Sequence, residues 1–106
     1  MKGRIVIVAY KPKAGKSAAL HELMKSHLAI LKSQDLVSER DSIMMEAKDG
    51  TIIEVFEWKS KEAIEQAHTN PAVHKMWSDY AEVCEYIPVA QLDEVNDLFA
   101  EFSPVN

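Results

Sequence analysis

His68 is the side chain in this sequence with the clearest potential for chemistry. It ends the apolar stripe of a short predicted helix, just before Asn70-Pro71. An imidazole titrates near neutral pH, so His68 could act as a general base that takes a proton from a substrate hydroxyl. The structural alternative is a histidine that caps the end of a helix, where its protonated form is favoured. The sequence leaves both interpretations open.

Aromatic residues on either side of His68 in the sequence could form the walls of a pocket. Trp58 ends a strongly apolar predicted strand, and Trp77 lies on the inward stripe of a later predicted helix. Both indoles could stack against a planar ring, or they could simply pack in the core. Tyr10 and Tyr80 could each donate a hydrogen bond to a substrate oxygen. The alternative is that each is a buried ring with its hydroxyl at the boundary of the core.

Two glutamates, Glu54 and Glu57, interrupt the apolar strand that ends at Trp58. Because side chains alternate along a strand, the two carboxylates lie on opposite faces. One of them could pair with His68 or Arg40 and shift a pKa, and we count Glu57 among the candidate substrate-binding residues. The alternative is that both lie in solvent at the ends of the sheet. The sequence does not decide which of the two faces a pocket.

The sequence predicts no metal site and no other catalytic motif. The histidines include no pair spaced i, i+3 or i, i+4, and the His-Glu-x-x-His motif is absent. The stretch Gly15-Lys16-Ser17 lacks the earlier glycine of a phosphate-binding loop. No serine lies in a glycine-flanked turn between a strand and a helix, so a Ser-His-Asp triad is not predicted either.

Composition predicts one soluble domain over residues 1–106. The net charge of −5 disfavours nucleic acid, which binds clustered basic residues. The lone Cys84 permits no internal disulfide and fits a reducing cytoplasm. The N-terminus shows no signal-peptide pattern, and no apolar run approaches the roughly 20 residues of a membrane helix. We therefore expect a cytoplasmic protein without nucleic-acid or membrane partners.

Hydrophobic periodicity predicts three strands and one helix in the first half of the chain. The first strand covers 4–10, and both of its faces are apolar. A helix follows over 16–33, and then a less regular strand over 36–48 that carries charged residues. Asp49-Gly50 is typical of a two-residue hairpin turn and joins this strand to the apolar strand over 51–58.

His27 lies on the apolar stripe of the predicted helix over 16–33. A histidine in that position is usually a core residue whose ring is hydrogen-bonded. We therefore interpret His27 as a structural residue rather than a ligand.

The second half of the chain begins with two short helices. Ser60 is a suitable N-cap for the first, and Asn70-Pro71 stops the chain and begins the second. The remaining predicted elements are a strand over 86–92 in which Pro88 suggests an edge or a bulge, a short helix over 93–98, and an apolar tail from Phe99 that needs a surface to pack on.

This order of elements, β-α-β-β-α-β, predicts an α+β fold of the ferredoxin-like type. One antiparallel sheet would carry both helical regions on the same face. The first and third strands are apolar on both faces, and the remaining elements are too few to cover the second face. We therefore expect a homodimer in which two sheets pack face to face and bury that apolar surface.

The stretch from Phe56 to Ala63, followed by Ala67-His68, Asn70-Pro71 and Trp77, resembles the dimeric α+β barrel proteins. Within that superfamily the chain is most similar to the antibiotic-biosynthesis-monooxygenase-type domain, and the likeness extends from the first strand to the fourth. The resemblance implies a pocket between the sheet and the helices of each subunit. It specifies the fold better than the function, because the superfamily includes many activities.

The resemblance implies a cofactor-independent monooxygenase acting on a small apolar hydroxyaromatic or quinone-type compound. His68 would be its catalytic base, and no cofactor would be needed. The heme-degrading branch does not fit, because the position of its iron-ligating histidine is occupied here by Trp77. The alternative is a non-catalytic dimeric module of the same fold that binds a small apolar molecule.

Overall fold

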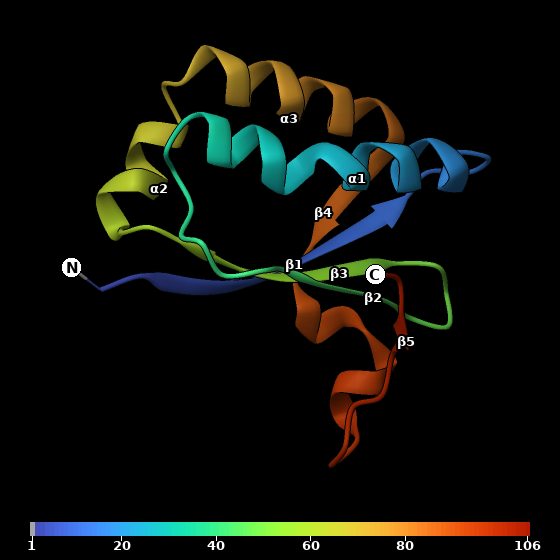
Figure 1. Ribbon diagram of the computed structural model, residues 1–106. Coiled ribbons are helices and arrows are strands. Elements are labelled where there is room, and N and C mark those ends of the chain that lie inside the picture. Colours follow the sequence, from blue (N-terminus) through green and yellow to red (C-terminus); the bar gives the residue numbers. More distant parts are fainter. Residues whose placement is uncertain (1) are drawn as a thin grey trace.

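As far as the fourth strand, strands and helices follow one another along the chain in the predicted order, and a fifth strand that was not predicted lies near the C-terminus (Figure 1). In the computed structural model, which describes residues 2–106, three α-helices lie on one face of an antiparallel sheet of five strands. The strands are β1 (Arg4–Pro12), β2 (Ile43–Glu46), β3 (Ile52–Trp58), β4 (Cys84–Ile87) and β5 (Ser103–Pro104), and the helices are α1 (Ser17–Ser33), α2 (Lys61–Ala67) and α3 (Pro71–Val83). Within the described residues, no helix combines the length and the apolar character needed to cross a bilayer.

The strands lie side by side in the order β4-β1-β3-β2-β5, and every neighbouring pair is antiparallel. This α+β arrangement is compatible with the ferredoxin-like plan. In the register of the two central strands, Val8 lies opposite Glu54 and Ile7 lies opposite Val55. Because side chains alternate, the even-numbered residues of β1 and β3 face the helices and the odd-numbered residues face the other side of the sheet.

The two caps predicted in the second half of the chain are present. The Ser60 side chain accepts the backbone N–H of Ala63 at 3.1 Å and begins α2. The Asn70 side chain accepts the N–H of Val73 at 3.1 Å, with Pro71 in the first turn of α3. Each cap satisfies a backbone donor that the helix leaves unpaired.

The turn between β2 and β3 occurs at the predicted place, but its loop has three residues rather than two. The N–H of Ala47 donates to the carbonyl of Thr51 at 2.8 Å, which leaves Lys48, Asp49 and Gly50 between them. Gly50 has φ 92°, a left-handed conformation that glycine adopts without steric penalty. A hairpin loop of this length with glycine in the left-handed position is a common alternative to the two-residue turn.

The strand predicted over 36–48 is much shorter in the structure. Within this range only Ile43–Glu46, which is β2, forms a ladder with β3, and an isolated bridge joins Val37 to Trp58. Between them, the Ser38 hydroxyl accepts the backbone N–H of Arg40 at 3.2 Å. Such local bonds compete with sheet pairing, and the charged residues that follow Ser38 are exposed.

The strand predicted over 86–92 is also displaced. Pairing with β1 begins at Cys84 and ends at Ile87, because Pro88 has no N–H with which to continue the ladder. Two short 3-10 helices follow, η1 (Val89–Gln91) and η2 (Asp93–Asn96), and the second replaces the predicted helix over 93–98.

The residues from 88 to 102, here called the C-terminal segment, extend from the face of the sheet opposite the helices (Figure 1). Leu92 and Phe102 of this segment pack against Ala9 and Ile53 and form a small second core. The apolar tail therefore docks only in part, because Leu98 and Phe99 are 92% and 78% exposed. The chain then returns to the sheet, where β5 pairs with β2.

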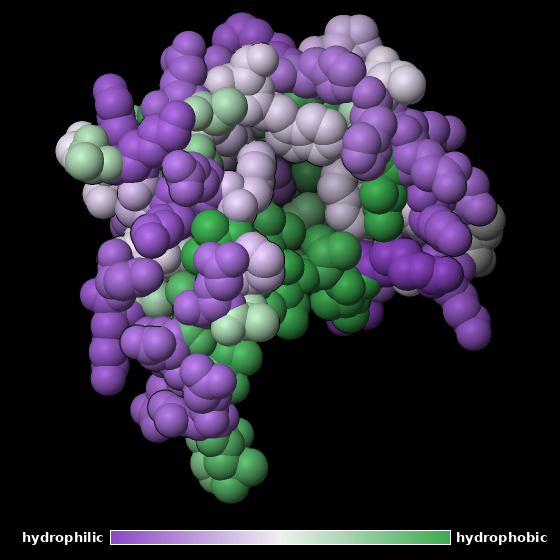
Figure 2. Space-filling model, turned by 180° about the vertical axis from the view of Figure 1, so that it is seen from behind, coloured by the Kyte–Doolittle hydropathy of each residue, from purple (hydrophilic) through white to green (hydrophobic). Residues whose placement is uncertain are grey.

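Much of the remaining outer sheet face is apolar and uncovered. Ile7, Val55 and Ile43 form a row across β1, β3 and β2. Ile7 is 55% exposed, Ile43 is 60% exposed, and the neighbouring Ile5 is 59% exposed. Figure 2 shows this apolar surface below the polar helical layer, with a second apolar patch at the tip of the C-terminal segment.

Candidate functional site

A cavity of about 340 Å³ lies between the inner face of the sheet and the helices. Most of its lining is aliphatic or aromatic, and no Lys, Arg, Asp or Glu contributes to it. In Figure 2 a hollow opens between the helical layer and the sheet. The lining residues are Val6, Val8 and Tyr10 from β1, His27 from α1, Phe56 and Trp58 from β3, Trp77 from α3 and Tyr86 from β4.

Strand alternation explains why these residues meet. The even-numbered positions of β1 and β3 point toward the helices and provide most of the sheet side of the cavity. Trp58 is buried and its ring lies 5.4 Å from that of Phe56, measured between centroids. Trp77 enters from α3, so the two indoles predicted as possible stacking residues both line the cavity.

A buried cluster of polar side chains lies in the wall of the cavity, built from Tyr10, His27 and Glu54. The Tyr10 hydroxyl donates a hydrogen bond of 3.0 Å to Glu54 Oε1. His27 Nδ1 approaches the same oxygen to 2.9 Å, but the ring N–H is not aligned for a hydrogen bond. The side chains of His27 and Glu54 are 4% and 0% exposed. The sequence indicated a structural role for His27 and left open which of Glu54 and Glu57 faces a pocket, and of these two glutamates only Glu57 was among the candidate substrate-binding residues.

Two polar atoms of this cluster have no hydrogen-bond partner. They are Glu54 Oε2 and His27 Nδ1, and both are fully buried. Buried polar groups are nearly always paired, because an unpaired group loses its hydration without compensation. Because it lies beside a cavity, a cluster with unpaired buried groups is a candidate for a catalytic or binding role rather than for a role in stabilising the fold.

Aromatic packing holds the cluster in position. Tyr80 stacks on Tyr10 with ring centroids 5.3 Å apart, and its hydroxyl lies 3.4 Å from the Met24 sulfur. The ring of His27 contacts Tyr80 and Phe56 edge-on, with centroids 5.6 Å and 5.4 Å away. Tyr80 is fully buried behind Tyr10 and does not line the cavity.

Burial and the nearby carboxylate both affect the tyrosines of the site. Burial raises the pKa of Tyr10 well above its ordinary value, and the negative charge of Glu54 raises it further. Burial, followed by the same charge, also raises the pKa of Tyr80. Both hydroxyls therefore remain protonated at neutral pH and can act as hydrogen-bond donors.

His68 lies outside the cavity in this structure. It is exposed and follows the last residue of α2, and its Nδ1 lies 2.9 Å from the carbonyl oxygen of Ile64. Its ring contacts Trp77 edge-on at 5.5 Å, and His74 Nε2 contacts the backbone oxygen of His68. This is the helix-capping position that the structural alternative describes. The only link of His68 to the cavity among these contacts is its contact with Trp77, which is one of the lining residues.

Glu57 is also separated from the cavity. It lies on the outer face of β3, where its Oε1 accepts the Ser38 hydroxyl at 2.7 Å and the Arg40 guanidinium at 3.2 Å. These hydrogen bonds, that from Ser38 first, lower the pKa of Glu57. Of the two glutamates in the strand, Glu54 is the one that faces the helices. The sequence contained a signal for this orientation: Glu54 is an even number of residues from Phe56 and Trp58, so all three lie on the same face of the strand.

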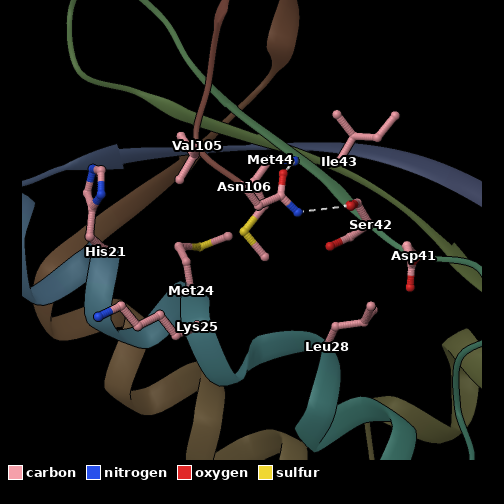
Figure 3. A pocket seen from close by; sticks show the side chains of 10 residues that line it. All are labelled: His21, Met24, Lys25, Leu28, Asp41, Ser42, Ile43, Met44, Val105 and Asn106. Atoms are coloured by element: carbon pink, nitrogen blue, oxygen red, sulfur yellow. Dashed lines mark hydrogen bonds between the residues drawn. The ribbon is translucent and has the colours of Figure 1, made fainter.

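A larger cavity of about 800 Å³ opens at the other edge of the sheet (Figure 3). Side chains of α1 face those of β2 and the chain end across it, and Asn106 Nδ2 donates to the Ser42 carbonyl at 3.1 Å. Its charged groups are solvated: Lys25 pairs with Glu22 in solvent, and Asp41 is exposed. No buried polar atom without a partner belongs to this lining, so its size alone does not indicate chemistry.

The cavity of 340 Å³ can hold a small planar molecule against aromatic walls and present it to an imidazole that is backed by a carboxylate. Among residues 2–106 no group of three or more His, Cys, Asp or Glu side chains is placed to hold a metal ion. Comparison of the chain with protein-family models, curated proteins and solved structures found no significant match.

Proposed function

We propose that this chain is a dimeric α+β barrel protein of the antibiotic-biosynthesis-monooxygenase type, which oxidises a small apolar hydroxyaromatic or quinone-type compound without a cofactor. The observation that carries the proposal is the cavity lined by Trp58, Trp77 and Phe56, whose polar side-chain groups are those of His27, the tyrosine hydroxyls and the indole N–H groups. Such a lining favours a ring that is uncharged in solution and carries a hydroxyl group, because no Lys or Arg side chain contributes to it.

The size of the cavity limits the substrate. A volume of about 340 Å³ is at the lower end of the range for small-molecule sites and suits one or two fused rings. In the proposed reaction, loss of the hydroxyl proton makes the ring electron-rich enough to react with O₂. One oxygen atom becomes a quinone oxygen and the other leaves as water, so the substrate supplies all the electrons.

The second part of the proposal is a homodimer formed through the outer sheet face. The row of Ile7, Val55 and Ile43 leaves apolar surface in water, which monomers rarely do over a continuous patch. A second copy would cover this row with the same row of its own, as two-fold symmetry requires. The C-terminal segment stands beside the row and would flank the partner (Figure 1).

The test is oxygen uptake with a panel of one-ring and two-ring hydroxyarenes and quinols, followed with an oxygen electrode and by quinone absorbance. Val8→Phe fills the aromatic cavity, and Val105→Phe serves as the matched control because it fills the larger cavity instead. We expect turnover in the wild type and in Val105→Phe, and its loss in Val8→Phe. Equal turnover in both variants would contradict the proposed site.

A non-catalytic binding module is the second candidate, and one observation favours it. His68, the base that the resemblance implies, is exposed and lies outside the lining of the cavity. A module of this kind would retain a hydroxyarene in native mass spectrometry, lose it in Val8→Phe, and consume no oxygen with any member of the panel.

A further inference from the structure

We propose that His27 is the proton acceptor of the cavity and that Glu54 is its positioning residue, so that the pocket binds a phenol or enol in its ionised form. This inference rests on the proposed function, because it assumes that the cavity of Trp58 and Trp77 is the substrate site. It differs from the expectation for His68 by assigning the base to the first helix.

The placement of the two rings favours His27 as the proton acceptor over His68. His27 lines the cavity and its ring is nearly buried, whereas His68 is exposed and does not line it. The group behind His68 Nδ1 is the neutral carbonyl of Ile64, whereas the group 2.9 Å from His27 Nδ1 is the Glu54 carboxylate. Among the described residues, no protein group forms a hydrogen bond with His27 Nε2.

The carboxylate behind the ring can hold the imidazole in the tautomer that leaves Nε2 free to accept a proton. Glu54 Oε1 lies 2.9 Å from His27 Nδ1, which is within hydrogen-bond distance although the N–H is not aligned with it. A carboxylate in that place fixes Nδ1 as the protonated nitrogen and stabilises the imidazolium that forms when Nε2 takes a proton. Glu54 does not line the cavity, so it acts through His27 and not on the substrate.

The remaining titratable groups around His27 do not compete for the proton. Tyr10 from β1 donates to Glu54, Tyr80 from α3 lies edge-on to the imidazole, and Tyr86 from β4 lines the cavity. In the proposed step, the substrate O–H bond breaks and an N–H bond forms at His27 Nε2. The electron pair stays on the substrate oxygen, so the step needs no oxidant.

The test uses 4-nitrophenol, whose ionised form absorbs visible light and whose neutral form does not. The probe is bound at a pH where it is mainly neutral in solution, and absorbance then measures the ionised fraction of the bound molecules. The variants are His27→Gln, Glu54→Gln and His68→Gln, with His21→Asn as the control because His21 is on α1 but outside this cavity. Circular dichroism checks that each variant is folded.

The expected result is that the wild type, His68→Gln and His21→Asn bind the probe in its ionised form. His27→Gln should bind it mainly in the neutral form. Glu54→Gln should raise the apparent pKa of the bound probe by about 1–3 units relative to the wild type, which is the usual effect of losing a charge partner. This dependence on Glu54 is a spectroscopic signature that a structural residue would not produce.

Three outcomes would overturn the inference, and they separate it from the proposed function. Equal ionisation in the wild type and His27→Gln would show that the His27–Glu54 pair is structural while leaving the binding site intact. Loss of ionisation in His68→Gln alone would assign the base to His68. Failure of the folded wild type to bind the probe would contradict both this inference and the proposed site.

Discussion

At the scale of single residues, Glu54 is the least expected side chain of this protein. A carboxylate with no exposed surface gives up its hydration, and here only Tyr10 provides a hydrogen bond in return. A hydrophobic side chain at the same position would fill the core without this desolvation penalty. The presence of an incompletely paired buried acid beside a cavity is therefore more easily explained by function than by stability.

Removal of the Glu54 carboxylate tests its present contribution to stability. Glu54→Ala leaves Tyr10 and His27 without their common partner and creates a void, so we expect a loss of about 3 kcal/mol in the free energy of unfolding. Glu54→Gln retains an acceptor for Tyr10 and should lose only about 1 kcal/mol. Urea unfolding at a fixed protein concentration measures both values.

The control for this experiment is Glu65→Ala, which removes an exposed glutamate from α2 and should change stability by less than about 0.5 kcal/mol. If Glu54→Ala were as stable as the wild type, the cluster would contribute nothing net to the fold.

The tyrosines provide a prediction of pH dependence. Burial raises the pKa of Tyr10, Tyr80 and Tyr86 above the ordinary value of 10.0, and these are all the tyrosines in the chain. The folded protein thus holds the phenolic protons more tightly than the unfolded chain. This contribution to stability is fully present below about pH 10 and is lost as the pH rises further.

Ultraviolet titration of tyrosinate, recorded together with circular dichroism, measures this effect. We expect little ionisation until the protein unfolds in alkali, with the half-exposed Tyr86 ionising before the other two. Three tyrosines titrating near pH 10 in folded protein would show that their rings are accessible to water.

At the scale of elements, the break between α2 and α3 determines how Trp77 reaches the cavity. Pro71 lies in the first turn of α3, and the Asn70 side chain caps that helix through the N–H of Val73. Both residues were recognisable in the sequence, because cap and proline signals are local. The orientation of α3 relative to the sheet depends on packing that no local signal encodes.

Replacement of the cap measures its contribution. Asn70→Ala removes the acceptor for the Val73 N–H and should lower the free energy of unfolding by about 1 kcal/mol. Asn70→Asp keeps an acceptor at the helix N-terminus and should retain most of that stability. Because Asn70 also donates to Gln34, Gln34→Ala is the control that isolates this second bond. Equal stability of Asn70→Ala and the wild type would show that the cap is dispensable.

At the scale of the whole molecule, the two sheet faces have different surroundings. The inner face meets the helices and contains the cavity, while the outer face is covered only where the C-terminal segment packs (Figure 1). The sequence correctly predicted that the remaining elements could not cover the second face. It did not predict that the C-terminal segment would cover part of it, because the periodicity of that segment is weak.

The exposed row leads to a prediction about assembly. Ile7→Lys places a charge within the proposed interface and should convert a dimer into a monomer, as measured by light scattering after size-exclusion chromatography. Ala29→Lys adds the same charge to an exposed position on α1 and should leave the dimer intact. A wild-type protein that is monomeric at all accessible concentrations would contradict the proposed assembly.

The sequence by itself determined the main elements from β1 to β4 and their order, but not β5. Short apolar runs predicted β1 and β3, helical periodicity predicted α1, and the caps at Ser60 and Asn70 predicted where α2 and α3 begin. These signals are short-range, since each depends on residues within a few positions of one another. The ends of β2 and β4 were less predictable, because strand pairing depends on partners far away in the chain.

The composition of the candidate site was decided only by the tertiary structure. Trp58, Trp77 and Tyr10 could be singled out because large aromatic residues on inward stripes are conspicuous in a sequence. Glu54 and His27 are 27 residues apart, on a strand and on a helix, and the contact between them depends on how α1 crosses the sheet. His68 ends the apolar stripe of α2 in the sequence, yet the structure leaves its side chain exposed to solvent. Periodicity in the sequence shows on which face of a helix or strand a residue lies. Only the packing of the elements decides which residues that face contacts.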